Sequence, residues 1–221
     1  DGTQSFVGFH TLPLRHGMTA GELAQMFKAE RFPYVDLAVV RCEGWNRETY
    51  FEATGLYWIN PSPNMRNLNP AILYPGVGLL EYTNISVGRG TDTPFEHLGA
   101  PWSDAGRLAS NLNLLRLPGV VFIPEMFTRS TSKFENEVCE GVRILIVDRA
   151  IIQPVRIGLA IASSLRHLHA DDWELQALNR LLSNNVVFQA IEADENLNQI
   201  FSNSEQGLES FKQRRVAFLL Y

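Results

Sequence analysis

The sequence has little of the features that would assign a function at once. Its two cysteines, Cys42 and Cys139, are too few for a disulfide framework and lack the spacing of a zinc site. The formal net charge of -5 gives no basic surface for nucleic acid, and no apolar run approaches the roughly 18 residues of a membrane helix. We therefore expect no metal or other cofactor, no nucleic-acid partner and no membrane span. Free or buried thiols are expected, with a Cys42–Cys139 disulfide as the alternative.

Sequence signatures of common catalytic sites are absent as well. Gly88-Arg89-Gly90 lacks the lysine of a phosphate-binding P-loop and the third glycine of a dinucleotide-binding fingerprint, and Asp92 beside it would repel an anion. The chain contains neither Gly-x-Ser-x-Gly nor His-Glu-x-x-His. These absences argue against nucleotide binding, an α/β-hydrolase and a zinc protease. The two glycines instead predict positive φ angles or a close approach of the backbone to a ligand.

The hydrophobic pattern predicts an α+β fold with a mixed α and β core. Thr19-Ala20-Gly21-Glu22 has the form of a capping box, so a helix is expected to begin there. Residues 36–40 and 142–147 are rich in β-branched side chains and predict two strands. Apolar residues at helical spacing predict that the final third is mostly helical, with helices over residues 157–168, 175–182, 190–201 and 204–219.

Residues 42–118 form a different kind of segment, crowded with Pro, Gly and Asn and expected to be largely irregular. Many aromatic residues of the chain gather there, among them Tyr50, Trp58, Tyr74 and Trp102. Disordered segments are poor in aromatic residues, whereas long irregular segments inside compact domains are often functional. We therefore expect an ordered surface that builds a binding site.

The residue types in this segment favour a site for a polar small ligand, with a carbohydrate as the leading interpretation. Amides such as Asn60, Asn64 and Asn84 can both donate hydrogen bonds to hydroxyls and accept them, and aromatic rings stack on the apolar face of a sugar. Arg89 offers a fork suited to a carboxylate. His16, before the first helix, is either a site residue or a local hydrogen-bonding group. Glycoside hydrolysis usually needs two carboxyl groups, and the segment offers Glu52, Glu81, Asp92 and Glu96.

Several stretches, taken together and in order, resemble one family. They are Asn60–Asn64, Tyr74–Gly76 running on to Gly78–Glu81, Ser86–Glu96 and Gly99–Trp102, with Ser5–Gly8, Arg15–Thr19, Cys139–Val142 and Arg215–Tyr221 outside this segment. The chain is similar in these stretches to the exo-β-N-acetylmuramidase (NamZ) family, and the resemblance covers essentially its whole length.

The resemblance implies a glycoside hydrolase that releases N-acetylmuramic acid from the non-reducing ends of peptidoglycan fragments, in the periplasm or outside the cell. Glu81 and Glu96 are the candidate catalytic residues, and Arg89 is expected to hold the lactyl carboxylate of muramic acid. The candidate substrate-binding residues are Arg89, Asn60, Asn64, Asn84, Tyr74, Thr91, Asp92 and His16.

Members of this family are expected to have two domains, with an N-terminal Rossmann-like half whose Gly-Pro-Glu-His-Gly motif carries a proposed catalytic acid. This chain has no such motif and begins at Asp1. We therefore expect residues 1–221 to correspond to the C-terminal domain, with the N-terminal half as an intramolecular or separate partner, and the chain alone to be incomplete as an enzyme. A non-catalytic module that binds muropeptides is the alternative.

Overall fold

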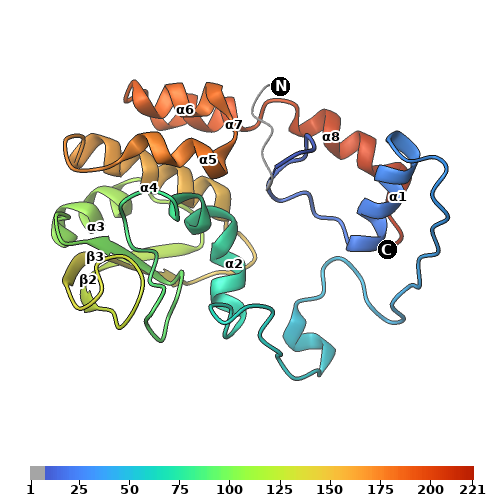
Figure 1. Cartoon of the computed structure of the whole chain (residues 1–221), viewed down its shortest axis with the longest axis horizontal. Helices are drawn as coiled ribbons and strands as arrows, with labels where there is room; N and C mark the ends of the chain where they lie inside the picture. Colours follow the sequence, from blue (N-terminus) through green and yellow to red (C-terminus); the bar gives the residue numbers. More distant parts are fainter. Residues whose placement is uncertain (1–7) are drawn as a thin grey trace. The chain divides into compact units, whose positions relative to one another are not determined.

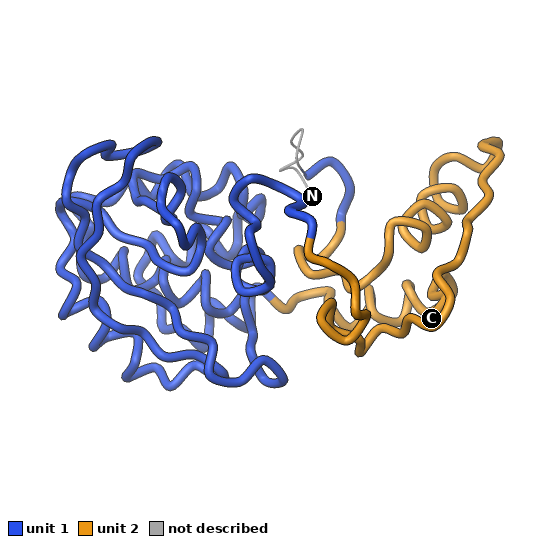
Figure 2. The backbone as a smooth tube through the Cα atoms, turned by 90° about the horizontal axis from the view of Figure 1, so that it is seen from below, with its two compact units in different colours: residues 1–11, 59–204 blue, residues 12–58, 205–221 orange. Residues whose placement is uncertain are grey.

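The structure, a computed structural model, describes residues 8–221 and divides them into two compact units (Figure 2). Of these residues, unit 1 contains 8–11 and 59–204, and unit 2 contains 12–58 and 205–221. Each unit is therefore assembled from two stretches that are far apart in the sequence. The family-like stretch Ser5–Gly8 lies outside the described residues except for Gly8.

Unit 1 contains a three-stranded antiparallel sheet in the order β1 (His97–Ala100), β3 (Val138–Ile146) and β2 (Val120–Thr128). Helix α3 (Ala105–Leu114) packs against β2 and β3, and α4 (Pro154–Leu168) packs against α3 (Figure 1). The remaining elements of unit 1 are α2 (Leu68–Val77), η2 (Gly78–Leu80), η3 (Leu175–Leu178), α5 (Asn179–Leu182), α6 (Asn185–Glu192) and α7 (Leu197–Ser204).

One hydrophobic core joins the sheet and the helices of unit 1. On β3, Val142 and Ile144 are buried in it, and α4 contributes the fully buried Ile161 and Leu165. These residues recur at a period of two on the strand and of about four on the helix, as burial of one face of each element requires. The sheet and α4 thus fix the frame on which the loops of unit 1 are held.

Helices α2 and α4 cross so closely that their backbones are in direct contact at Gly76 and Gly158. A Cβ atom at Gly76 would lie 1.9 Å from the carbonyl oxygen of Pro154, and one at Gly158 would lie 2.4 Å from the carbonyl oxygen of Gly76. Only glycine has no Cβ, so only glycine permits this approach at both positions. The contact holds α2, and the segment that leads into it, against the core.

The close pairing of β1 with β3 also depends on two glycines. Gly99 lies opposite Gly141 in the register of the two strands, and a Cβ atom at Gly141 would lie 2.0 Å from the carbonyl oxygen of Leu98. Both glycines belong to stretches that resemble the family, so these matches have a packing reason.

Unit 2 is a small helical unit whose core contains Met18, Met26 and Phe211. Its elements are α1 (Ala20–Glu30), η1 (Phe51–Thr54), α8 (Leu208–Arg215) and η4 (Val216–Phe218). The capping box predicted at the start of α1 is present, since Thr19 Oγ1 accepts from the Glu22 N–H and Glu22 Oε2 accepts from the Thr19 N–H.

The buried Glu22 links both stretches of unit 2. Its Oε1 accepts hydrogen bonds from Arg47 at 2.6 Å and from the backbone N–H of Leu220 at 2.7 Å. Burial alone would raise the pKa of Glu22, but the hydrogen bonds from Arg47, Leu220 and Thr19 outweigh it and lower the pKa from 4.5 to about 2. The ionised form of Glu22 therefore stabilises the folded unit.

The structure confirms the α+β class, the helix after Thr19, a strand over residues 142–146 and the long helix after Pro154. Both cysteines are free, with Cys42 exposed and Cys139 buried. None of the helices among the described residues is long and apolar enough to cross a membrane.

The structure corrects three expectations about local structure. Residues 36–40 form no strand, because no other described strand of unit 2 is available to pair with them. Residues 42–118 lie mostly outside helices and strands, as expected, but they also contain the regular elements α2, β1 and α3. The helix expected over residues 190–201 is two helices, because α6 ends at Glu192 and α7 begins at Leu197.

The crossing of α2 and α4 leads to a first prediction. Gly158→Ala places a methyl group against the Gly76 backbone, which cannot move aside like a side chain, so we expect a loss of roughly 2–3 kcal/mol in the free energy of unfolding. Gly106→Ala is the matched control, because the nearest heavy atom to its Cβ, Asp104 Oδ1, lies at 3.6 Å. Urea unfolding of both variants measures the difference, and equal midpoints would contradict this account of the crossing.

The pKa of Glu22 leads to a second prediction. Because the folded-state pKa is below the unfolded one, the contribution is fully present above about pH 5 and is lost as the pH falls toward 2. Glu22→Gln should therefore destabilise the protein by on the order of 3 kcal/mol at pH 7, and the gap from the parent should narrow between pH 5 and 2. Urea unfolding across this pH range measures it, with the exposed Glu43→Gln as control. A gap that is independent of pH would show that the charge of Glu22 is not what stabilises the unit.

Candidate functional site

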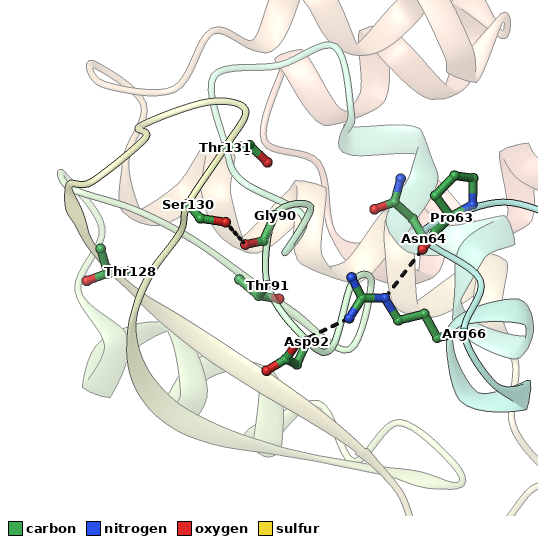
Figure 3. Close-up of a pocket in the computed structure, with 9 residues that line it drawn as sticks. All are labelled: Pro63, Asn64, Arg66, Gly90, Thr91, Asp92, Thr128, Ser130 and Thr131. Carbon is green, nitrogen blue, oxygen red and sulfur yellow. Dashed lines mark hydrogen bonds and ion pairs between the residues drawn. The ribbon is translucent and has the colours of Figure 1, made fainter.

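A polar cavity of about 520 Å³ opens on the surface of unit 1. Its walls come from three segments of the chain, residues 63–66, 90–92 and 128–131 (Figure 3). The lining residues are Pro63, Asn64, Arg66, Gly90, Thr91, Asp92, Thr128, Ser130 and Thr131. The volume falls in the range of small-ligand sites, and hydroxyl, amide and charged groups suit a ligand rich in hydroxyls.

The wall formed by residues 90–92 belongs to a tight loop. Gly88 and Gly90 have φ angles of +78° and +85°, which confirms the prediction of positive φ at both glycines. A Cβ atom at Gly88 would lie 2.4 Å from the ring of His97, and one at Gly90 would lie 2.6 Å from the carbonyl oxygen of Thr131. The loop can therefore take this course only with glycine at both positions.

This loop is attached to the segment that follows β2. The carbonyl oxygen of Gly90 accepts hydrogen bonds from the backbone N–H of Ser130 at 3.3 Å and from Ser130 Oγ at 3.1 Å. Two walls of the cavity are thus bonded to each other. Their hydroxyl groups keep a fixed spacing, as recognition of a polar ligand requires.

Arg66 and Asp92 face each other across the cavity. Arg66 Nη1 lies 3.1 Å from Asp92 Oδ1, and Figure 3 shows the guanidinium reaching from the 63–66 segment toward the carboxylate. The side chain of Asp92 is fully exposed and that of Arg66 is about half exposed. An ion pair this accessible to water contributes little stability. The Arg66 guanidinium can therefore exchange Asp92 for an anionic group of a ligand.

A buried network supports Thr91 from behind the cavity wall. His97 is buried and stacks on Phe127, its Nδ1 lies 2.8 Å from Glu125 Oε2, and its Nε2 lies 2.9 Å from Thr91 Oγ1. Glu125 Oε1 in turn accepts two hydrogen bonds from Arg143, at 2.9 and 2.6 Å. The chain of contacts runs from β3 through β2 and β1 into the cavity wall.

The pKa values of this network have identifiable causes. Burial lowers the pKa of His97 below its ordinary 6.5, although Glu125 acts in the opposite direction. Burial alone would raise the pKa of Glu125, but hydrogen bonds from Arg143 and His97 lower it. A neutral His97 with its proton on Nδ1 donates to Glu125, which leaves its Nε2 as an acceptor. The single proton of the Thr91 hydroxyl is shared between the carbonyl oxygen of Gly88, at 2.7 Å, and this Nε2, at 2.9 Å. Gly88 and His97 together fix the position of the Thr91 hydroxyl in the cavity wall.

A second cluster gathers around Glu81. Arg89 Nη1 lies 3.0 Å from Glu81 Oε1, the Tyr74 hydroxyl donates to Glu81 Oε2 at 3.4 Å, and the Lys133 ammonium donates to the backbone oxygens of Glu81 and Thr83. Burial, followed by the charge of Glu81, raises the pKa of Tyr74, and burial lowers the pKa of Lys133. The guanidinium of Arg89 is therefore already paired with the carboxylate of Glu81. The side chains of this second cluster do not line the cavity.

The structure brings together some of the residues predicted for the site. Asn64, Thr91 and Asp92 line the cavity, whereas Tyr74, Glu81 and Arg89 form the second cluster. Asn60 is exposed outside the cavity lining. No aromatic ring lines the cavity, so the described residues offer no stacking platform there.

Three further residues predicted for the site belong neither to the cavity lining nor to the Glu81 cluster. Glu96 accepts a hydrogen bond from Asn69 at 3.2 Å. Asn84 is structural, because its amide bonds the backbone of residues 172 and 174 at 2.7 Å each. His16 belongs to unit 2, where its Nδ1 accepts from the N–H of Met18 and where burial and Arg215 lower its pKa. The local hydrogen-bonding alternative for His16 is therefore present in the structure.

Sequence reasoning missed Arg66, the hydroxyl groups of residues 128–131 and the His97–Glu125–Arg143 network. Arg66 lies two residues beyond a stretch that was singled out, and His97 directly follows another. The hydroxyl groups lie at the end of β2 and directly after it. The hydrophobic pattern does not reveal this strand, because Pro124 and Glu125 interrupt it. If β2 had been recognised from the sequence, the cavity wall formed by residues 128–131 could have been located at its end.

Known proteins similar to this chain give the site a family context. Residues 1–69 match the family model described as exo-β-N-acetylmuramidase NamZ, N-terminal, and residues 72–221 match the model described as its C-terminal part. The peptidoglycan β-N-acetylmuramidase NamZ of Bacillus subtilis (strain 168) is 38% identical over 220 residues, which cover 98% of this chain and 53% of the relative. The chain thus spans about half the length of this curated relative.

Two crystal structures of DUF1343 family proteins from Bacteroides fragilis NCTC 9343 are similar as well. One has a TM-score of 0.91 and the other a TM-score of 0.74, each at 28% sequence identity. The matches cover 100% and 99% of this chain and 60% of each solved chain. The cavity draws Asn64 and Arg66 from the N-terminal family match and its other two walls from the C-terminal match. The matched stretches together account for nearly every residue, and the chain belongs to the NamZ exo-β-N-acetylmuramidase family.

Proposed function

We propose that the chain contributes a substrate-binding wall of an exo-β-N-acetylmuramidase, which removes N-acetylmuramic acid from the non-reducing ends of peptidoglycan fragments. Membership of the family supports this activity, and the Bacillus subtilis relative is named for action on peptidoglycan. The observation that carries the proposal is the polar cavity of unit 1, which combines hydroxyl and amide groups with one accessible guanidinium. Because this substrate belongs to the cell wall, we also propose a location in the periplasm or outside the cell.

The chemistry of muramic acid matches the lining of the cavity. Its hydroxyl and N-acetyl groups can bond Asn64, Thr91 and the hydroxyl groups of residues 128–131. Its lactyl carboxylate distinguishes it from N-acetylglucosamine, and a guanidinium binds a carboxylate through two parallel hydrogen bonds. Arg66 lines the cavity, so we assign the carboxylate to it. The sequence analysis expected Arg89 to hold this carboxylate. Arg89 could do so only if its guanidinium broke its ion pair with Glu81.

The cavity offers less to catalysis than to binding. Asp92 is the one carboxylate among its described lining residues, and it is paired with Arg66. Glycoside hydrolysis usually uses two carboxyl groups on either side of the scissile bond. We therefore propose that a further acid comes from another part of the family fold. This same observation favours the second candidate function, binding of muropeptides without hydrolysis.

Arginine substitutions test the assignment of the carboxylate. Arg66→Ala should reduce the preference for N-acetylmuramic acid over N-acetylglucosamine by about 10- to 100-fold, since a hydrogen bond to a charged group is worth about 1.5–3 kcal/mol. Isothermal titration with both sugars measures the preference, and the exposed Arg107→Ala is the control. A loss in Arg89→Ala but not in Arg66→Ala would return the role to Arg89. An unchanged preference in both variants would exclude both arginines.

A chromogenic β-N-acetylmuramide tests the activity itself. The chain alone should bind the sugar but release no chromophore, because the cavity presents a single carboxylate. Addition of the N-terminal half of a family member should start release. Turnover by the chain alone would contradict the need for a second source of acid. Binding that never leads to turnover, with the N-terminal half supplied, would favour the binding module.

A further inference from the structure

The hydroxyl group of Thr91 has three hydrogen-bonding partners in the protein. Thr91 is half-buried and lines the cavity of unit 1 (Figure 3). Its Oγ1 lies 2.7 Å from the carbonyl oxygen of Gly88 and 2.9 Å from His97 Nε2, and it accepts from the backbone N–H of Thr93 at 3.2 Å. A hydroxyl carries one proton and two lone pairs. The protonation of His97 therefore decides how much of this capacity is left for a ligand.

A neutral His97 leaves one lone pair of Thr91 Oγ1 open. With its own proton on Nδ1, the imidazole offers only a lone pair at Nε2, so the single proton of Thr91 serves both Gly88 and His97. The backbone N–H of Thr93 takes one lone pair of Oγ1. Among the described residues, no further group bonds the second lone pair. A hydroxyl of a ligand in the cavity can therefore donate to it.

A protonated His97 closes this acceptor. The charged imidazole carries a proton on both ring nitrogens, so Nε2 then donates to Thr91 Oγ1 and occupies the second lone pair. The proton of Thr91 goes to the carbonyl oxygen of Gly88 alone, and Thr93 keeps the other lone pair. The protein thus saturates the hydroxyl. A ligand hydroxyl would meet no acceptor there, and a hydrogen bond would be lost.

The imidazole of His97 is held in place in both protonation states. Its ring stacks on Phe127 with a centroid distance of 4.1 Å, and a Cβ atom at Gly88 would lie only 2.8 Å from its Nε2. Glu125 Oε2 lies 2.8 Å from Nδ1, and two hydrogen bonds from Arg143 fix Glu125 in turn. Protonation therefore changes the role of Nε2 without moving the ring.

Charged groups on both neighbouring strands and next to β1 act on the titration of His97. They are Glu125 of β2, Arg143 of β3 and Glu96 immediately before β1. In the cavity loop, Arg89 is paired with Glu81, and Asp92 is paired with Arg66. Burial outweighs the two carboxylates and lowers the pKa of His97 below 6.5. His97 is therefore neutral at pH 7 and takes up a proton only in more acidic solution.

We propose that His97 is a positioning residue of the sugar site, whose neutral form keeps the Thr91 hydroxyl open as an acceptor for a hydroxyl of the ligand. This role rests on the proposed function and adds a rule of specificity to it, because the group of the sugar that meets Thr91 must be a donor. His97 lies between two stretches that resemble the family and belongs to neither. Sugar affinity is highest while His97 is neutral and falls as the pH drops and the imidazole takes up a proton.

Isothermal titration of N-acetylmuramic acid from about pH 8 to about pH 4.5 tests this dependence. We expect binding to be about five- to tenfold weaker once His97 is protonated, which is the worth of one hydrogen bond. NMR of the imidazole nitrogens in the chain without sugar gives the pKa of His97 and its tautomer, for which we expect the proton on Nδ1. The two midpoints should coincide. N-acetylglucosamine, which has no carboxylate to titrate, should show the same pH dependence.

Two kinds of variant separate this role from a merely structural one. Thr91→Val should bind weakly at every pH, and Thr91→Ser should restore the parent profile. In Glu125→Gln, Arg143 retains the amide oxygen, so the amide NH₂ faces Nδ1 and the proton of His97 moves to Nε2. Binding should then be about five- to tenfold weaker already at pH 7, although Glu125 does not line the cavity. The exposed Glu135→Gln, between β2 and β3, is the matched control.

Three outcomes overturn the role of His97. These are an affinity that stays constant while His97 titrates, a proton on Nε2 in the neutral parent, and a Glu125→Gln variant that binds as the parent does. The measurements on the parent need no substitution, so they decide the question even where a variant does not fold. Absence of sugar binding at every pH is a different result, because it overturns the proposed function and this role with it.

Discussion

The contact of Gly76 with Gly158 is the constraint on which the candidate site depends. It lets α2 lie directly against the backbone of α4, which is itself the most buried helix of the core. The segment 63–66 leads directly into α2 and carries Asn64 and Arg66. One wall of the cavity is thereby held at a fixed place relative to the sheet, whose loops form the other two walls. A polar site on loops can be specific only where rigid elements hold those loops.

Much of the fold was predictable because it follows from local chemistry. The capping box of Thr19 and Glu22 predicts the helix that follows Thr19. The helical spacing of apolar residues predicts α4. The positive φ angles of Gly88 and Gly90 follow from the residue type. In these cases the nearest neighbours in the sequence are also the partners in space. Short strands such as β1, with four residues, offer no such local pattern.

The candidate site was harder to predict because its parts are distant in the sequence. Thr91 and Asp92 are brought close to Arg66 and Ser130 by the sheet and by the packing of α2, not by their positions in the sequence. Sequence reasoning chose Arg89 for the lactyl carboxylate because a guanidinium suits that group, but in the structure Arg89 pairs with Glu81 and does not line the cavity. Residues 36–40 illustrate the opposite error. Their pattern is that of a strand, yet a pattern cannot supply the neighbour that a strand requires.

The boundary between the two family matches has a consequence for how such proteins can exchange parts. Residues 70–71 separate the matches, and they lie inside helix α2, which runs from Leu68 to Val77. Recombination at that point would join the first residues of α2 from one parent to the rest of the helix from another. Arg66 and its cavity wall would then come from one parent, and Gly76, which packs against α4, from the other. The boundaries of the compact units lie elsewhere, after residues 11, 58 and 204. Exchange of residues 59–204, which carry all three walls of the cavity, therefore needs two crossovers, one after residue 58 and one after residue 204.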